Sequence, residues 1–320
     1  MRGPILASVL LVLAAPLSGG QNPNAPAPPP PTDDRIGFVN SNDRMSVPVT
    51  IAGAGPYRFI VDTGAQRTVI SRELAGTLGL APGPNVRLTA MTGASDVGTV
   101  VIPMISVSTL GGTKIEAPSL ESRNLGAPGM LGLDTLQGNA LSIDFEHQIM
   151  TVTPSTRRTR NIGAEPGDII VRARNVYGQL IVTDARYRGQ RVQVILDTGS
   201  GITMGNLALQ KRVARRDKKL HPISLIGVTG ETMIVNYTQI DRFDVAGMTI
   251  SNLPVAFADA EPFRHFGLTD QPALLLGMDA LRLFKQVRID FPNREIRLSV
   301  ARDPVHNATF SPTEAVKIGS

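Results

Sequence analysis

The triplet Asp-Thr-Gly occurs twice in this chain, at residues 62–64 and 197–199. Each copy follows a run of apolar residues, and a threonine follows each Asp at the same distance, Thr68 and Thr203. Two carboxyl groups within hydrogen-bond distance of each other cannot both ionise, so they share a proton and one becomes a base and the other an acid. Such a pair can take a proton from water while polarising a carbonyl group, which hydrolyses an amide without a metal or a covalent intermediate. If Asp62 and Asp197 meet, they are candidate catalytic residues.

The other residues of the two triplets are expected to support the carboxyl groups. Thr63 and Thr198 would position the turns through their hydroxyl groups, and Gly64 and Gly199 would let the backbone pass close to the carboxylates and to a substrate. At this point a purely structural interpretation remains open, in which the triplets are two buried strand ends capped by Asx turns.

The two halves of the chain repeat each other beyond the triplets. Residues 130–136 match residues 275–281, and residues 141–145 match residues 287–291, in the same order as the triplets. A repeat this long indicates a duplicated domain, because solenoid repeats run at roughly 20 to 50 residues. Gly132 and Gly277 lie between apolar residues in the first matched pair, and we expect each to pass in a strand beneath its Asp turn.

Composition and local pattern predict an all-β fold. Aromatic residues make up 4% of the chain and Trp is absent, whereas Val, Ile, Thr, Gly and Pro are plentiful. Alternating or apolar runs separated by turn residues predict two hairpins, one in each half. These hairpins span residues 47–51 with 57–61, and residues 180–184 with 191–196. Short helices are expected at residues 72–78, 207–216 and 279–284.

The motifs resemble those of the retropepsin and pepsin clan of aspartic proteases. Residues 62–70, Asp-Thr-Gly-Ala-Gln-Arg-Thr-Val-Ile, are similar to the active-site segment of retroviral proteases, and Asp-Thr-Gly-Ser at 197–200 is similar to that of pepsins. Residues 131–134 and 276–279 resemble the apolar-apolar-Gly strand that lies behind the catalytic turn. The resemblance covers residues 35–300. It implies an acid protease fold of two similar β-barrel lobes, with one Asp from each lobe meeting in the cleft between them.

The resemblance also implies flaps that close over a bound peptide. Thr92-Gly93 and Thr229-Gly230 each lie between β-rich runs and are candidate hairpin tips that contact substrate. Pepsins carry one flap with a Tyr, and no Tyr lies near either pair; the Trp and disulfides usual in pepsins are missing too. The chain therefore resembles the retropepsin-like side of the clan, with two possible flaps. Two ordinary surface hairpins remain the alternative.

The ends of the chain predict export. A positive start, an apolar run at residues 5–15 and small residues at 18–20 predict a signal peptide over residues 1–20, and the run is too short to span a bilayer. The protein is expected to be periplasmic or secreted. The expected divisions are a Pro-rich tether at 21–34, an N-terminal lobe at 35–156, a linker at 157–168, a C-terminal lobe at 169–302 and a C-terminal tail at 303–320.

Several classes of protein are excluded or disfavoured by composition. With no cysteine the chain is not a disulfide-stapled, zinc-ribbon or Fe–S protein, and its four His residues lack metal-ligand spacing, so we expect no metal and no cofactor. The 32 basic and 27 acidic residues leave a formal charge of only +5. The basic run at 211–219 has no interleaved aromatic residues, which favours a solvated helix face over nucleic-acid binding.

The sequence thus predicts an exported aspartic endopeptidase that acts on peptides or proteins, without stable membrane insertion once the signal peptide is removed. A monomer is expected, because one chain supplies both Asp residues. Two alternatives remain: a catalytically silent peptide-binding module with the same fold, and a cell-envelope adaptor that acts through the basic run and the Pro-rich tether. Binding by the adaptor would survive loss of both Asp residues.

Overall fold

The structure is a computed structural model that describes residues 34–41, 44–107, 110–156, 168–214, 219–245, 247–300 and 316–317. The expected signal peptide at 1–20 lies outside the described residues, as do nearly all of the Pro-rich tether and the linker and most of the C-terminal tail. In the described part of the chain, no helix is long and apolar enough to cross a membrane.

The first half of the chain forms a closed six-stranded barrel. Its strands follow the order β3-β4-β10-β5-β9-β8, and β8 pairs back to β3. They are β3 (Arg44–Ile51), β4 (Ala54–Val61), β5 (Val69–Ser71), β8 (Thr99–Val107), β9 (Leu110–Leu120) and β10 (Gly129–Leu131). The β4 strand, which leads to Asp62, lies parallel to β10, which leads to Gly132. The barrel therefore places the two sequence motifs side by side.

The second half repeats this path with one interruption. Its strands run in the order β14-β17-β22-β18-β21-β20-β15. They are β14 (Gln179–Val182), β15 (Ala185–Tyr187), β17 (Gln193–Leu196), β18 (Met204–Gly205), β20 (Thr232–Val245), β21 (Met248–Phe257) and β22 (Ala273–Leu276). Because β14 and β15 follow one another in the chain, the path returns to its start, and together they take the place that β3 holds in the first half. Again the strand that ends before the Asp, β17, lies parallel to the strand that ends before the Gly, β22.

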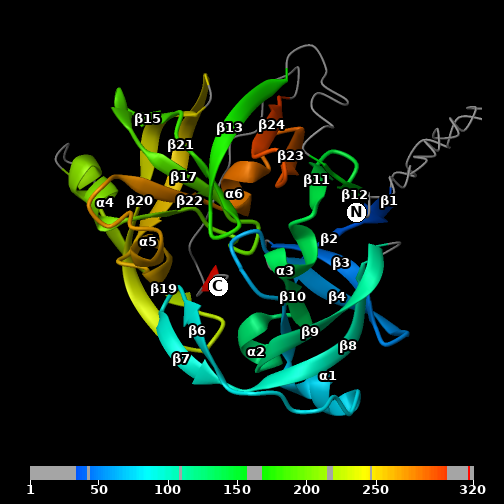
Figure 1. Cartoon of the computed structure of the whole chain (residues 1–320). Helices are drawn as coiled ribbons and strands as arrows, with labels where there is room; N and C mark the ends of the chain where they lie inside the picture. The colour runs from blue at the N-terminus through cyan, green and yellow to red at the C-terminus, as the bar shows by residue number, and fades with distance from the viewer. Residues whose placement is uncertain are drawn as a thin grey trace, which may run out of the picture. The chain divides into compact units, whose positions relative to one another are not determined.

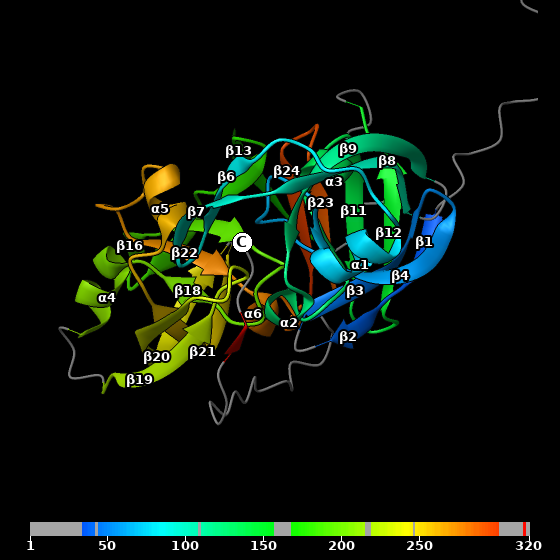
Figure 2. The same ribbon diagram turned by 90° about the horizontal axis from the view of Figure 1, so that it is seen from below.

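A further sheet joins the two halves, with three strands from each. In order these are β1 (Asp34–Gly37), β12 (Ile149–Pro154), β11 (Asn139–Asp144), β23 (Gln286–Asp290), β24 (Glu295–Ser299) and β13 (Ile169–Val176). At its centre the repeated segments pair with each other, antiparallel, so that Leu141 faces Ile289 and Ile143 faces Val287. Figures 1 and 2 show β11, β23 and β24 between the two barrels. The repeated strands β11 and β23 therefore also form the contact that joins the two halves of the chain.

The helices are short. They are α1 (Arg72–Thr77), α2 (Ser122–Leu125), α3 (Leu133–Leu136), α4 (Leu207–Ala214), α5 (Glu261–His265) and α6 (Met278–Leu281). The expected helices correspond to α1, α4 and α6, although α6 is shorter than expected and residues 215–216 lie outside the described residues. The sequence did not predict α2, α3 or α5, because four or five residues are too few to display a helical period.

The remaining strands lie at the edges and form the hairpins. They are β2 (Val39–Ser41), β6 (Val86–Ala90), β7 (Gly93–Val97), β16 (Gln190–Arg191), β19 (His221–Ile226) and β25 (Val316–Lys317). The β6 and β7 strands pair only with each other among the described strands, whereas β25 adds in parallel to β19. Part of the segment expected to be a tail is thus paired with the second hairpin.

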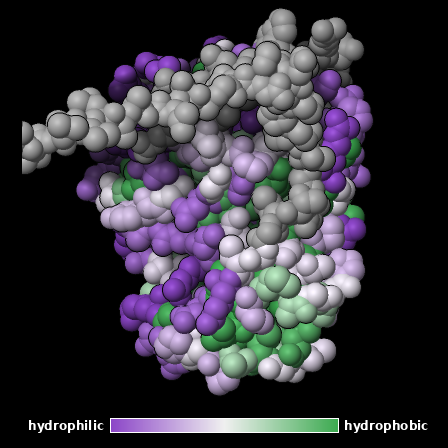
Figure 3. Space-filling model, turned by 45° about the vertical axis from the view of Figure 1, so that its right-hand side comes forward, coloured by the Kyte–Doolittle hydropathy of each residue, from purple (hydrophilic) through white to green (hydrophobic). Residues whose placement is uncertain are grey.

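The described surface mixes hydrophilic and hydrophobic residues, as one face in Figure 3 illustrates. The large apolar side chains that are exposed come from separate elements and include Met104, Tyr177 and Ile234. Isolated apolar side chains of this kind are normal on soluble proteins. The apolar core lies inside the two barrels and beneath the joining sheet.

Gly132 and Gly277 pack directly against the backbone of the loops that follow Asp62 and Asp197. The amide of Gly132 donates to Thr68 Oγ1 at 3.0 Å, and that of Gly277 donates to Thr203 Oγ1 at 3.1 Å. A Cβ atom on Gly132 would lie 2.5 Å from the carbonyl oxygen of Arg67, and one on Gly277 would lie 2.5 Å from that of Ile202. Because these neighbours are backbone atoms of the Asp loops, they cannot rotate away as a side chain could.

We predict that Gly132→Val and Gly277→Val each lower the free energy of unfolding by about 1–3 kcal/mol, the usual range for overpacking. Peptide cleavage should fall together with stability, since the displaced backbone belongs to the loops that carry the two Asp residues. The control is Gly138→Val, because Gly138 is exposed and a Cβ there would meet nothing within 4 Å. Thermal melts of the three variants test this, and unchanged melting of the first two would contradict it.

Candidate active site

The Asp62 turn begins where β4 ends. The amide of Asp62 donates to Leu131 O on β10 at 2.9 Å, which anchors the residue to the neighbouring strand. Its carboxylate Oδ1 accepts hydrogen bonds from the amides of Gly64 at 2.8 Å and Ala65 at 3.0 Å. The side chain is fully buried. An Asx turn therefore holds this carboxyl group in one orientation.

The Asp197 turn has the same construction. Its amide donates to Leu276 O on β22 at 3.0 Å, and its Oδ1 accepts from the amides of Gly199 at 3.0 Å and Ser200 at 3.2 Å. This side chain is also buried. The Asx-turn interpretation raised by the sequence is thus correct as local structure, and it does not compete with the catalytic one, because the same turns bring the carboxyl groups together.

The two carboxyl groups lie side by side. A Cβ atom built on Gly64 would lie 2.9 Å from Asp197 Oδ1 and 3.1 Å from Asp62 Oδ1, so both groups converge on that backbone position. A Cβ atom on Gly199 would collide with the carboxyl group of Asp62. Glycine is required at both places because the carboxyl groups occupy the space that a side chain would take.

This proximity changes the acidity of Asp197. Burial is the main cause that raises the pKa of its carboxyl group well above the ordinary value, and the negative charge of Asp62 raises the pKa further. The backbone hydrogen bonds from Gly199 and Ser200 act in the opposite direction, while a side-chain hydrogen bond with Asp62 again raises the pKa. The pair therefore retains a proton at pH values where an exposed Asp would have lost it.

Thr63 and Thr198 tie the two turns together reciprocally. Thr63 Oγ1 donates to Leu196 O at 2.9 Å and accepts from the Thr198 amide at 3.2 Å. Thr198 Oγ1 donates to Val61 O at 2.7 Å and accepts from the Thr63 amide at 3.1 Å. Each hydroxyl group thus bonds to the backbone of the other half, and all four partners are buried.

Asp134 and Asp279 support the same loops, a role that the sequence did not reveal. Asp134 accepts from the amide of Thr68 at 2.9 Å and from its hydroxyl at 2.6 Å, and Asp279 accepts from Thr203 at 3.0 and 2.6 Å in the same way. Burial raises the pKa of Asp279 to about 6 despite these hydrogen bonds, which lower it. Their only sequence signal was their equivalent place in the repeat.

The candidate flap residues lie at hairpin tips, as expected. Thr92 is in the turn between β6 and β7, Thr229 is in the turn between β19 and β20, and their hydroxyl oxygens are 3.4 Å apart. Gly93 and Gly230 have φ angles of 147° and 89°, which glycine adopts readily and other residues rarely do. The structure therefore brings the four residues together, each pair from its own half of the chain.

The hairpin tips are interlocked, which distinguishes them from ordinary surface hairpins. Met91, at the tip of the first hairpin, is buried in an apolar cluster made otherwise of residues from the second half. Val228, at the tip of the second hairpin, is buried in a cluster made otherwise of residues from the first half. Each tip therefore reaches across to the opposite barrel.

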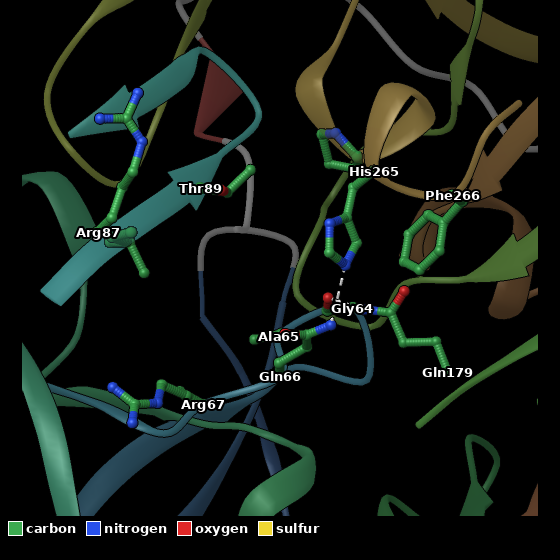
Figure 4. A pocket seen from close by; sticks show the side chains of 11 residues that line it. Gly64, Ala65, Gln66, Arg67, Arg87, Thr89, Gln179, His265 and Phe266 are labelled. Atoms are coloured by element: carbon green, nitrogen blue, oxygen red, sulfur yellow. Dashed lines mark hydrogen bonds between the residues drawn. The ribbon is translucent and has the colours of Figure 1, made fainter. Parts of the chain in front are cut away.

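A pocket opens beside the Asp62 turn (Figure 4). Its walls come from residues 64–67 after Asp62, from β6, from Gln179 and from α5. Gln66 Nε2 lies 3.1 Å from His265 Nε2 and links the turn to α5, while the Tyr177 ring packs 4.5 Å from the His265 ring. The sequence did not reveal this pocket, because its walls are far apart in the chain.

No group of three or more His, Cys, Asp or Glu side chains suited to a metal ion occurs among the described residues. The groups that the structure does bring together for chemistry are the two carboxyl groups, one of which favours the protonated form. Such a pair can take a proton from a water molecule and polarise a carbonyl group.

Comparison with known families agrees with this geometry. The sequence model described as aspartyl protease matches the chain in two stretches, residues 47–135 and 183–280. The chain belongs to this family. Each stretch contains one Asp-Thr-Gly turn and the Gly segment packed behind it, so the two-lobed retropepsin-like fold of this chain is confirmed. No curated protein matches the chain.

We predict that Thr63→Val and Thr198→Val each destabilise the protein by about 1–3 kcal/mol, because each leaves buried backbone groups without a partner. Since the two threonines share one network, the double variant should lose less than the sum of the single variants. Urea denaturation of the four proteins measures this coupling. Thr77→Val is the control, because Thr77 is exposed and bonds only within its own helix. Strict additivity would show that the two residues act independently.

Proposed function

We propose that the protein is an endopeptidase that hydrolyses peptide bonds with a water molecule activated by Asp62 and Asp197. The observation that carries the proposal is the convergence of two buried carboxyl groups, one from each half of the chain, with the pKa of Asp197 well above its ordinary value. This supports a pair with one negative charge, in which Asp62 is the base and Asp197 the acid.

The proposed reaction begins when Asp62 takes a proton from water as the water oxygen attacks the carbonyl carbon of the peptide bond. Asp197 gives its proton to the carbonyl oxygen, which produces a tetrahedral diol. The proton now on Asp62 then passes to the leaving nitrogen, and Asp197 regains a proton from one diol hydroxyl as the C–N bond breaks. The products are a carboxylic acid and an amine, and the pair returns to its starting charge.

Substrate access requires movement of the hairpins. Both Asp side chains are buried, and the two tips bury Met91 and Val228 against the opposite halves. We infer that the tips separate to admit a peptide and that residues Thr92, Gly93, Thr229 and Gly230 then line its outer side. The pocket beside residues 64–67 would receive a substrate side chain next to the reacting bond.

We also propose that this reaction takes place outside the cytoplasm and that the working form is a monomer. The first part rests on the signal-peptide pattern of residues 1–20. The second rests on the presence of both Asp turns in one chain, which removes the need for a second copy to complete the pair.

The decisive experiment is replacement of each Asp. We predict that Asp62→Asn and Asp197→Asn each abolish cleavage of a casein-type substrate while the protein stays folded, because an amide keeps the shape and removes the shared proton. Asp270→Asn, at an exposed loop position, is the matched control and should retain full activity. Near-normal turnover by either active-site variant would refute the assignment. A wild-type protein that binds peptides and cleaves none would instead be the silent binding module.

We further predict a bell-shaped dependence of kcat/KM on pH. Activity requires one proton on the pair, so the rate should rise as the first carboxyl group ionises and fall as the pH passes the raised pKa of Asp197. The falling limb should therefore lie above the ordinary range of an Asp side chain, with the highest rate at acid to mildly acid pH. Steady-state kinetics from acid to alkaline pH measure this, and a plateau that persists to alkaline pH would argue for another mechanism.

A further inference from the structure

Arg44, the first residue of β3, is a fully buried cation without a paired carboxylate among the described residues. Its Nη2 donates to Leu125 O at 2.5 Å, but its Nε and Nη1 are buried and have no hydrogen-bond partner in the described part of the chain. Burial lowers the pKa of Arg44, while the charges of Asp62 and Asp197 raise it, so the guanidinium group lies near the catalytic pair. Buried donors without acceptors are rare, and burying a charged group costs free energy, so a functional reason for this guanidinium group is expected.

The duplication places Gln179 at the equivalent position. Arg44 precedes Asp62 by the same number of residues as Gln179 precedes Asp197, and each begins the first strand of its barrel. Gln179 is buried too; its Nε2 donates to Gly64 O, and its Oε1 has no partner among the described residues. The two positions therefore flank the carboxyl pair but differ in their unsatisfied groups. Arg44 has donors without acceptors, whereas Gln179 has an acceptor without a donor.

Gln179 lines the open pocket of Figure 4, whose other walls include α5. In the first half, α2 holds the place of α5, because it lies between β9 and β10 as α5 lies between β21 and β22. Arg44 bonds to the last residue of α2, Leu125, and so lies beside the helix that is equivalent to α5. Leu125 packs in the same apolar cluster as Val228 from the second hairpin tip. Separation of the hairpins would therefore uncover the Arg44 side.

We propose that Arg44 is a specificity residue that binds the carboxylate of a Glu or Asp side chain in the substrate, on one side of the cleaved bond only. The inference rests on the proposed endopeptidase function. A guanidinium group with free Nε and Nη donors can bind a carboxylate through two parallel hydrogen bonds, which neutral side chains do not match. Gln179, with a free acceptor, offers no such site on the other side.

The test is cleavage of peptide pairs that differ only by Glu or Gln, with the residue moved through each position on both sides of the bond. The wild-type protein should favour Glu at one side by at least about tenfold in kcat/KM, the usual effect of a hydrogen bond to a charged group. Arg44→Met should reduce this ratio to about one, with both peptides compared at the same pH. Arg123→Gln, an exposed charge change on the same helix as Leu125, should keep the preference.

One further variant and a melting measurement separate specificity from structure. Gln179→Arg should create a second Glu preference on the opposite side of the bond. Arg44→Met should remain folded, because an apolar side chain of similar length fills the same space and removes the cost of burying a cation. Equal cleavage of Glu and Gln peptides by the wild type, or an unchanged preference in Arg44→Met, would overturn the proposal. So would a large drop in melting temperature together with loss of cleavage of both peptides, since Arg44 would then be structural.

Failure of this inference is distinguishable from failure of the proposed function. Binding of the same peptides to Asp62→Asn, measured by calorimetry, requires no turnover and should show the Glu preference. If the wild type cleaves nothing while Asp62→Asn still prefers Glu, the catalytic proposal fails and the Arg44 site stands. If the wild type cleaves both peptides equally, the catalytic proposal stands and the Arg44 site fails.

Discussion

The structure depends on holding two buried carboxyl groups next to each other, an arrangement that their mutual repulsion opposes. Protonation removes part of that repulsion, as the raised pKa of Asp197 shows. The rest is overcome by fixed donors: each carboxylate accepts two backbone amides from its own turn, and the Thr63 and Thr198 hydroxyl groups lock the turns to each other. Because both carboxyl groups and both threonine hydroxyl groups are buried, displacement of any of them leaves polar atoms without partners.

Duplication explains how one chain meets this requirement. Each half provides the same strand, turn and glycine-bearing segment, and the repeated strands β11 and β23 pair with each other where the halves join. The halves are not identical, however. A continuous β3 in the first half corresponds to β14 and β15 in the second, and Arg44 corresponds to Gln179. A peptide is itself directional, so chemically different sides of the cleft can distinguish its two ends.

Much of the site was predictable because its chemistry is local. Asp-Thr-Gly with its following threonine is a contiguous pattern, and its recurrence with a matching Gly segment is enough to identify Asp62, Asp197, Gly132 and Gly277. Single-turn helices such as α2 and α5 left no comparable signal, since a period needs more than one turn to appear. The roles of Asp134 and Asp279 were hidden for another reason: their threonine partners are more than sixty residues away.

The sequence by itself determined the all-β class, the duplication, the residues of the carboxyl pair and the positions of both hairpin tips, because each follows from short-range pattern and repetition. Only the tertiary structure decided which groups the cleft presents. The crossing of the hairpins that buries Met91 and Val228, the pocket between the Asp62 turn and α5, and the free donors of Arg44 all arise from contacts between distant segments. Burial and hydrogen-bond satisfaction are properties of packed neighbours, and no local stretch of sequence specifies them.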